Sequence, residues 1–158
     1  MHKITPFLWF DHQAEEAARF YVSVFKNSKL GTISRHGEGG PGPAGSVMSV
    51  SFQLEGQRFH ALNGGPHFTF TPAISLFVDC KTQREVDTLW RKLSSGGKEG
   101  RCGWLQDRYG LSWQIVPSGL GELIKDPAAM QAMLGMTKLD IRRLRAAAAT
   151  GARRRRGT

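Results

Sequence analysis

The first 66 residues show the pattern of one strand, one helix and three further strands. The apolar run Ile4–Phe10 predicts a buried strand. Apolar residues then recur at helical spacing from Ala14 to Phe25, and Asp11 is placed to cap that helix. Alternating polar and apolar residues predict three strands after the helix, over 30–36, 46–54 and 58–64.

The same order of elements begins again in the second half. The apolar run Ala73–Asp79 ends in an aspartate as the first strand does, and Asp11 and Asp79 are 68 residues apart. Thr82 and Glu85 form a capping box that opens an amphipathic helix. Two strands are then predicted around 100–106 and 111–116, joined by a turn at Tyr109-Gly110. This period indicates an internal duplication.

The net charge of +9 is concentrated near the C-terminus. Residues 137–158 hold eight Lys or Arg against one acid, which leaves +2 for residues 1–136. Arginine runs at a chain end are usually solvated. We therefore expect 146–158 to be a basic disordered tail with no specific nucleic-acid partner, whose removal after Arg145 costs little stability.

The remaining composition predicts a cytoplasmic protein. The sequence has no run of 18 apolar residues and no apolar secretory segment at its start, so we expect no membrane partner. Its two cysteines, Cys80 and Cys102, fit neither a disulfide framework nor a metal site, and we expect two free thiols.

Several strings along the chain, in order, resemble one known family. They are "ITPFLWFD", "AEEAARFYVSVF", "GPAGSVMSVSFQL", "ALNGGPHF", "CGWLQDRYGLSWQIVP" and "QAMLGM". They are similar to the PhnB-like branch of the glyoxalase/bleomycin resistance superfamily, also called the vicinal oxygen chelate fold. Members of this branch are often labelled 3-demethylubiquinone-9 3-methyltransferase domains.

This resemblance implies an α+β fold of two βαβββ modules, whose curved mixed sheets enclose a cavity, followed by C-terminal helices. It implies a single domain over 1–145, made of modules 1–66 and 67–118 and of helices within 119–145. It also implies a homodimer, since members commonly assemble in pairs.

Metal-dependent members of the superfamily hold a divalent ion with four inward-facing His or Glu side chains. The resemblance places these positions at Ile4, Ala61, Ala73 and Gln114, with Asn63 in place of Ala61 if the register shifts. None of these residues is a histidine or a carboxylate, and an amide carbonyl is a weak ligand. We therefore expect no metal ion and no other cofactor.

The methyltransferase label requires a site for S-adenosylmethionine. The usual site is a glycine-rich turn from a strand into a helix. The only glycine-rich run, Gly37–Gly45, is interrupted by two prolines and flanked by predicted strands. The residues therefore disfavour this activity.

We expect a mostly aromatic cavity with few polar groups. By strand alternation Ser112 and Gln114 share a face, whereas His60 faces away from the cavity side that we assign to Ala61. His67 is either an exposed loop residue or a group that contacts or titrates against a ligand. The candidate ligand-binding residues are Gln114, Ser112, Asn63, His67, Trp9, Trp104, Phe59 and Phe77.

Two functions fit these residues. The first is metal-independent binding of a small, partly apolar molecule in the cavity. The second is a metal-dependent enzyme of the glyoxalase or dioxygenase type, with ligands outside the expected positions, or an enzyme that uses His67 as a base. The missing metal ligands favour the first, and the residues name neither the ligand nor a catalytic group.

Overall fold

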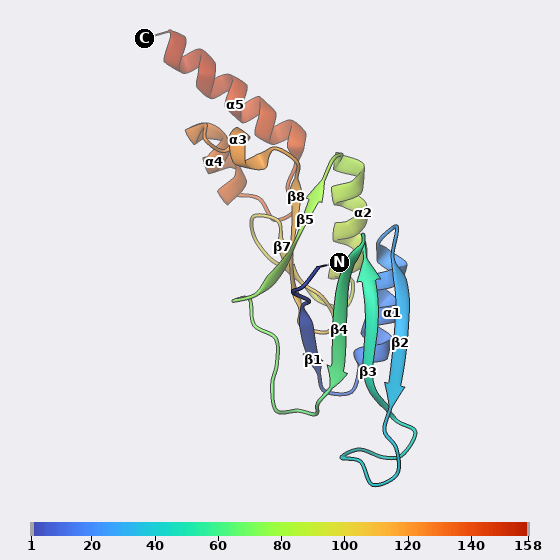
Figure 1. The fold of residues 1–158 in the computed structure, drawn as a ribbon. Helices are drawn as coiled ribbons and strands as arrows, with labels where there is room; N and C mark the ends of the chain where they lie inside the picture. Colours follow the sequence, from blue (N-terminus) through green and yellow to red (C-terminus); the bar gives the residue numbers. More distant parts are fainter. Residues whose placement is uncertain (1, 158) are drawn as a thin grey trace. The chain divides into compact units, whose positions relative to one another are not determined.

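The computed structural model describes residues 2–157, and the chain divides into two compact units that adjoin between Phe70 and Thr71. The first unit runs in the order strand, helix, strand, strand, strand (Figure 1). Its elements are β1 (Phe7–Phe10), α1 (Ala14–Val24), β2 (Lys29–Arg35), β3 (Val47–Leu54) and β4 (Gln57–Asn63). They form a sheet of order β1-β4-β3-β2, in which β1 and β4 are parallel.

The second unit repeats this order. Its elements are β5 (Ser75–Cys80), α2 (Gln83–Ser94), β6 (Lys98–Glu99), β7 (Trp104–Gln106) and β8 (Ser112–Pro117). The sheet order is β5-β8-β7-β6, and β5 and β8 are again parallel. The α+β fold and the internal duplication expected from the sequence are therefore confirmed.

Helix α1 covers one face of the first sheet (Figure 1). The ring of Tyr21 on α1 lies 6.2 Å from that of Phe52 on β3, and Phe52 stacks on Phe59 of β4 at 5.3 Å. Strand alternation places Ala61, which has no exposed surface, on the same face. We call the opposite side, which carries Phe7, Trp9, Ser51, His60 and Leu62, the open face of the first sheet.

The core of the second unit lies between α2 and its sheet. Buried side chains at helical spacing on α2 match buried alternate positions on β7 and β8 (Val86, Leu89, Trp90 and Leu93; Leu105, Trp113 and Ile115). The Thr82 cap is present, because the Glu85 N–H donates to Thr82 Oγ1 at 3.1 Å, while the Glu85 carboxylate accepts from the Lys81 N–H at 2.9 Å and not from Thr82. We call the other side, with Ser75, Phe77, Trp104, Gln106, Ser112 and Gln114, the open face of the second sheet.

The turn between β7 and β8 is built on one buried carboxylate. Asp107 Oδ1 accepts hydrogen bonds from the backbone N–H groups of Tyr109 and Leu111, at 2.8 and 3.1 Å. Its Oδ2 accepts from the indole N–H of Trp113 at 2.8 Å. Gly110 adopts φ 86°, a conformation that glycine tolerates without a steric cost. The turn expected at Tyr109-Gly110 is confirmed and brings β8 back beside β7.

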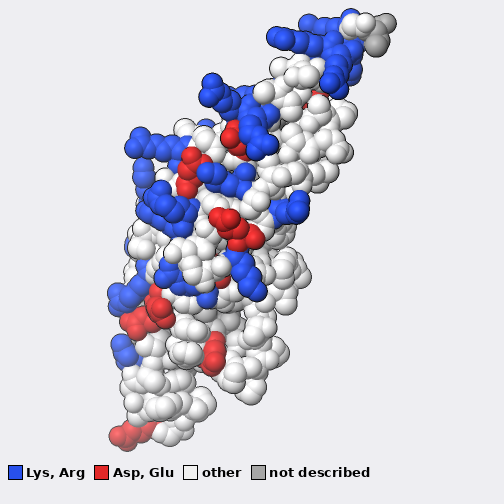
Figure 2. All heavy atoms as spheres, turned by 180° about the vertical axis from the view of Figure 1, so that it is seen from behind, with Lys and Arg blue, Asp and Glu red and all other residues white. Residues whose placement is uncertain are grey.

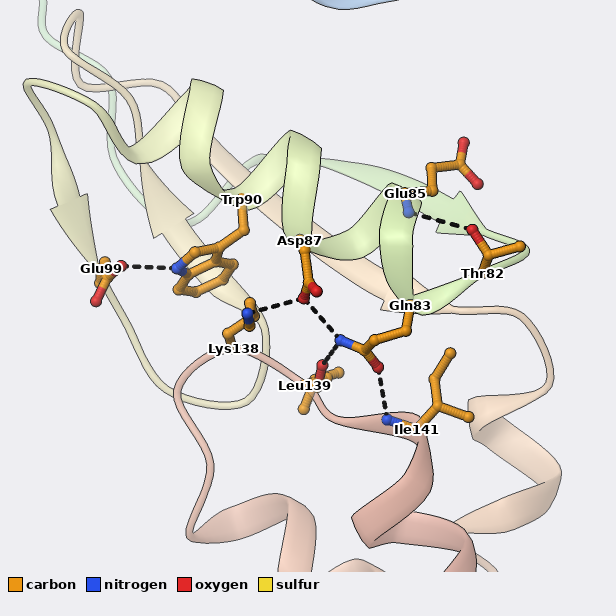
Figure 3. A network of polar contacts seen from close by, with 9 residues as sticks. All are labelled: Thr82, Gln83, Glu85, Asp87, Trp90, Glu99, Lys138, Leu139 and Ile141. Carbon is orange, nitrogen blue, oxygen red and sulfur yellow. Dashed lines mark hydrogen bonds and ion pairs between the residues drawn. The ribbon is translucent and has the colours of Figure 1, made fainter.

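Three helices follow the second sheet: α3 (Leu120–Leu123), α4 (Pro127–Leu134) and α5 (Ile141–Arg156). The segment before α5 is fastened to α2 through Gln83 and Asp87 (Figure 3). The Gln83 amide donates to Leu139 O at 3.0 Å and accepts from the Ile141 N–H at 2.8 Å. Asp87 accepts from Gln83 at 2.9 Å and pairs with Lys138 at 2.8 Å. The helices therefore belong to the second unit.

The structure corrects the expected disordered tail, because α5 continues as a helix to Arg156. Its buried Gly151 lies against the start of α4, where an added Cβ would come within 2.8 Å of Asp126 Oδ1. Arg155, one turn further on, pairs with the carboxylate of Asp126. Gly151 and Ala128 let the two helices approach closely at this point. Figure 2 shows basic side chains gathered at this end of the chain.

Among residues 2–157 there is no helix that combines the length and the apolar character needed to cross a membrane.

Candidate functional site

The open face of the second sheet carries two rows of side chains. Sheet register aligns Phe77 on β5 and Trp104 on β7 with Gln114 on β8. The next row aligns Ser75 and Gln106 with Ser112 in the same way. Residues in one row of a sheet lie close enough for their side chains to interact. The structure therefore brings together four of the predicted residues, which are Gln114, Ser112, Trp104 and Phe77.

Gln114 is held by a hydrogen bond across the sheet. Its Nε2 amide donates to Ser75 Oγ at 2.9 Å, and its Oε1 carbonyl makes no hydrogen bond with any described residue. Ser112 is 1% exposed, and its hydroxyl likewise has no partner among the described residues. Buried polar atoms are normally paired, so the unpaired Ser112 hydroxyl, two positions from Gln114 on the same strand face, indicates a place where a ligand or water binds.

Two aromatic rings flank this polar group. Phe77 is 60% exposed, which is unusual for a phenylalanine on a strand, and Trp104 is half-buried. Both can stack on an apolar or aromatic molecule. The site thus combines neutral hydrogen-bonding groups with two aromatic surfaces. Its second row continues to Lys98 on β6, which is aligned with Gln106 at the far edge of the sheet.

On the first sheet, Trp9 is fixed by its own unit. Its indole N–H donates to Gly65 O at 3.0 Å, and Phe68 meets its ring edge-on at 4.9 Å. A Cβ on Gly64 would overlap the indole ring, so glycine is needed there. His67 is exposed in the same segment. Trp9 and His67 therefore both belong to the first unit, near the end of β4, whereas Gln114 belongs to the second unit.

The remaining two candidates lie on the helix-covered side of the first sheet. Phe59 is 5% exposed and belongs to the core under α1. Asn63 Oδ1 accepts a hydrogen bond from the Ala14 N–H at 2.8 Å, and its Nδ2 donates to Val47 O at 3.2 Å. The side-chain amide of Asn63 therefore caps the start of α1. The expected capping by Asp11 is wrong, since the helix starts at Ala14 after Gln13.

The two faces of β4 are the reverse of the prediction. His60 lies on the open face, where its ring is 6.0 Å from that of Phe7. Ala61 is buried on the face that α1 covers. The sequence pattern "RFHALNG" alternates correctly but does not say which of its two faces the helix covers. The packing of Tyr21 of α1 on Phe52, which stacks on Phe59, decides this.

The positions that the resemblance assigns to metal ligands do not fit a metal ion here. Ile4 is 86% exposed and precedes β1, Ala73 precedes β5, and Ala61 lies beneath α1. Gln114 alone offers an oxygen ligand. In the part of the chain that the structure describes, no group of three or more His, Cys, Asp or Glu is arranged to hold a metal ion.

A site for S-adenosylmethionine does not fit either. The glycine-rich segment forms the loop between β2 and β3, closed by hydrogen bonds from the His36 N–H to Ser46 O and from the Gly45 N–H to His36 O. A loop between two antiparallel strands offers no helix N-terminus to receive a charged cofactor. The sequence-based objection to this cofactor therefore agrees with the local geometry.

A cavity of about 790 Å³ lies beside this loop, within the first unit. Its wall includes His12, Glu15 and Glu16 at the start of α1 and His36 on the loop, with Asn63 from the end of β4. The sequence did not predict this cavity, because the loop that forms part of its wall, residues 41–43, has no periodic pattern. It also missed Ser75, although Ser75 is two positions before Phe77 and so shares its face.

Comparison with solved structures gives the same fold. A PhnB protein from Bacillus cereus is 43% identical, with a TM-score of 0.69, and the match covers 74% of this chain and 100% of that one. Protein PA1353 from Pseudomonas aeruginosa is 20% identical, with a TM-score of 0.62, over 74% and 98% of the two chains. FosX from Listeria monocytogenes, a fosfomycin resistance protein solved with Mn(II) and sulfate, is 13% identical, with a TM-score of 0.54, over 79% and 98%.

The chain therefore has the fold that these three solved structures share. The chain belongs to the family described as 3-demethylubiquinone-9 3-methyltransferase, whose family model matches residues 2–116 and which includes the PhnB protein from Bacillus cereus. Helices α3 to α5 lie beyond that match. No protein of curated function matches the chain.

Proposed function

We propose that this protein binds a small, partly apolar molecule on the open face of its second sheet, without a metal ion. The observation that carries the proposal is that the Ser112 hydroxyl and the Gln114 carbonyl, on one face of β8, have no hydrogen-bond partner among the described residues, while Phe77 and Trp104 lie in the row of Gln114. A few convergent polar groups within an apolar surface are typical of small-molecule sites.

The neutral character of these groups limits the ligand. A hydroxyl can donate to or accept from a ligand, and an amide carbonyl accepts from an N–H or O–H. Gln114 and Ser112 are themselves neutral, and the charged Lys98 lies two strands away from Ser112 in its row, so the part of a ligand that meets Gln114 and Ser112 meets uncharged groups. Phe77 and Trp104 favour a planar apolar part beside those atoms.

The binding proposal is tested by NMR titration of the full chain with a set of small neutral aromatic amides and phenols. Binding should shift the side-chain amide signals of Gln114 and the indole signal of Trp104. Gln114→Ala should weaken binding about tenfold, since it removes one hydrogen bond to the ligand. Gln131→Ala, at an exposed position on α4, is the matched control and should have no effect. Equal binding by both variants would refute the site.

The metal-free part of the proposal rests on the side chains at Ile4, Ala61, Ala73 and Gln114. Metal analysis of protein purified without chelator should give far less than one equivalent of zinc, nickel, manganese or iron per chain. One equivalent that is lost in Gln114→Ala would instead favour the metal-dependent enzyme.

We also propose a homodimer. Strands β1 and β5 are edge strands of their sheets, and Phe7 and Phe77 on them are each 60% exposed. Exposed apolar edges favour association. Sedimentation at tens of micromolar, well above the dissociation constant expected of a standard interface, should show twice the 17.5 kDa chain mass. A stable monomer under these conditions would contradict the proposal.

For location we propose the cytoplasm, because both cysteines are free thiols and Cys80 is buried in the core. Fractionation of cells that express the tagged chain should place it with cytosolic markers, and recovery with a secreted or membrane fraction would contradict this.

A further inference from the structure

A small hollow lies on the open face of the first sheet, where β2, β3 and β4 run side by side. Its volume is about 260 Å³. Sheet register aligns Lys29 and Arg58 on either side of Gln53, and Ser51 and His60 form the next row. These five side chains, with Thr32, line the hollow.

The hollow depends on an irregularity in β2. The register of β2 against β3 shifts between Leu30 and Ile33, which is a β-bulge. In the bulge, the Thr32 N–H donates to Ser51 Oγ at 2.8 Å. A Cβ on Gly31 would lie 2.9 Å from Ser51 O, and the absence of a side chain there leaves the space open.

The charge of the lining is positive. Lys29 and Arg58 form no ion pair with any described residue, and no carboxylate lines the hollow. Ser51 accepts the Thr32 hydrogen bond, so its hydroxyl hydrogen remains to donate. Gln53 and His60 add further N–H donors. The lining therefore offers donors and positive charge with no group that repels an anion.

We propose that this hollow binds a small doubly charged oxyanion of the phosphate class. An arginine binds two oxygens of such an anion at once, and a lysine adds a point charge. The volume is below the range of whole drug-sized ligands and suits a single anionic group. This site lies on the other unit from Gln114 and Ser112, and it carries charge where they carry none, so it is independent of the proposed neutral-ligand site.

The test is titration of the full chain with inorganic phosphate in low-salt buffer, followed by amide NMR. Phosphate should shift the amide signals of Thr32, Ser51 and Gln53 along one saturating curve. Arg58→Gln and Lys29→Gln should each weaken binding about tenfold, the effect expected for loss of one charge-assisted hydrogen bond. Added chloride salt should weaken binding in the unaltered chain, because the cations are exposed.

The arginines of α5 are a competing source of phosphate binding, and the amide signals separate the two. Arg91→Gln and Lys92→Gln, exposed cations on α2, are matched controls and should leave the curve unchanged. Gln114→Ala should also leave it unchanged, so failure of one proposed site does not imply failure of the other. Shifts confined to α5, or equal affinity in Arg58→Gln, would overturn the proposal.

Discussion

Asn63, at the end of β4, accepts a hydrogen bond from the N–H of Ala14, which lies 49 residues earlier and begins α1. The residue that precedes the helix, Gln13, makes no side-chain cap. The start of α1 is therefore defined by a strand and not by its own sequence. Strand alternation alone does not reveal this contact, which is why the sequence predicted Asn63 as a ligand-binding residue.

Replacement of Asn63 by Ala should destabilise the protein by about 1–2 kcal/mol, because it leaves the start of α1 uncapped. The Val47 carbonyl also loses its donor. Urea unfolding followed by circular dichroism measures the change. Asp11→Ala is the matched control, since Asp11 does not cap the helix, and it should change stability little. A larger effect of Asp11→Ala would show that the cap lies there after all.

Gly151→Val should detach the end of α5 from α4, because a Cβ at this position comes within 2.8 Å of Asp126 Oδ1 and 3.1 Å of the Ala128 Cβ. Overpacking of this kind typically costs about 1–3 kcal/mol. Hydrogen exchange over residues 146–156 should accelerate. Ala149→Val, on the exposed side of the same helix, has the same β-branched side chain without the clash and serves as control.

For the same reason truncation after Arg145 should lower the melting temperature, contrary to the expectation from the sequence. An unchanged melting temperature and unchanged exchange in α4 would show that α5 does not dock in solution.

Acid should release the C-terminal helices from their two carboxylate anchors. Hydrogen bonding to Arg155 lowers the pKa of Asp126 below its usual value of 3.8, and hydrogen bonds from Lys138 and Gln83 lower the pKa of Asp87 in the same direction. A lowered folded-state pKa means that the stabilisation is complete above the usual pKa and is lost as the pH falls through the lowered one.

Exchange in α5 should therefore be constant near neutral pH and rise only below about pH 4. Asp126→Asn should exchange faster at neutral pH and show less dependence on acid. Glu122→Gln, which alters only the exposed pair with Lys125, should behave like the unaltered chain. Identical acid profiles for Asp126→Asn and the unaltered chain would contradict the role of this carboxylate.

Cys80 should resist alkylation in the folded protein. Burial, with the nearby charges of Glu85 and Asp79, raises the pKa of its thiol to about 12. The reactive thiolate is therefore almost absent at pH 8. Iodoacetamide labelling followed by mass spectrometry should leave Cys80 unmodified until denaturant is added, whereas Cys102 provides the internal comparison. Rapid labelling of Cys80 in native protein would mean that β5 opens.

Local sequence determined most of the elements, because their signals act over a few residues. The apolar period of Val86, Leu89, Trp90 and Leu93, with the Thr82 cap, was sufficient to predict α2. The repeated strand-ending aspartates were sufficient to predict the duplication, since equivalent spacing builds equivalent sheets. The pair of Ser112 and Gln114 on one face followed from strand alternation alone, as did the turn before them.

Tertiary structure alone decided which face of each strand the helices cover, and hence which residues remain for ligands. Alternation along β4 is equally compatible with Ala61 or His60 facing the helix. The packing of Tyr21 of α1 on Phe52, beside Phe59, places Ala61 on the helix side. The row of Lys29, Gln53 and Arg58 likewise exists only after three strands are paired in register. The helical C-terminus has the same origin, because the fit of Gly151 against Asp126 depends on residues 25 positions apart that no local pattern relates.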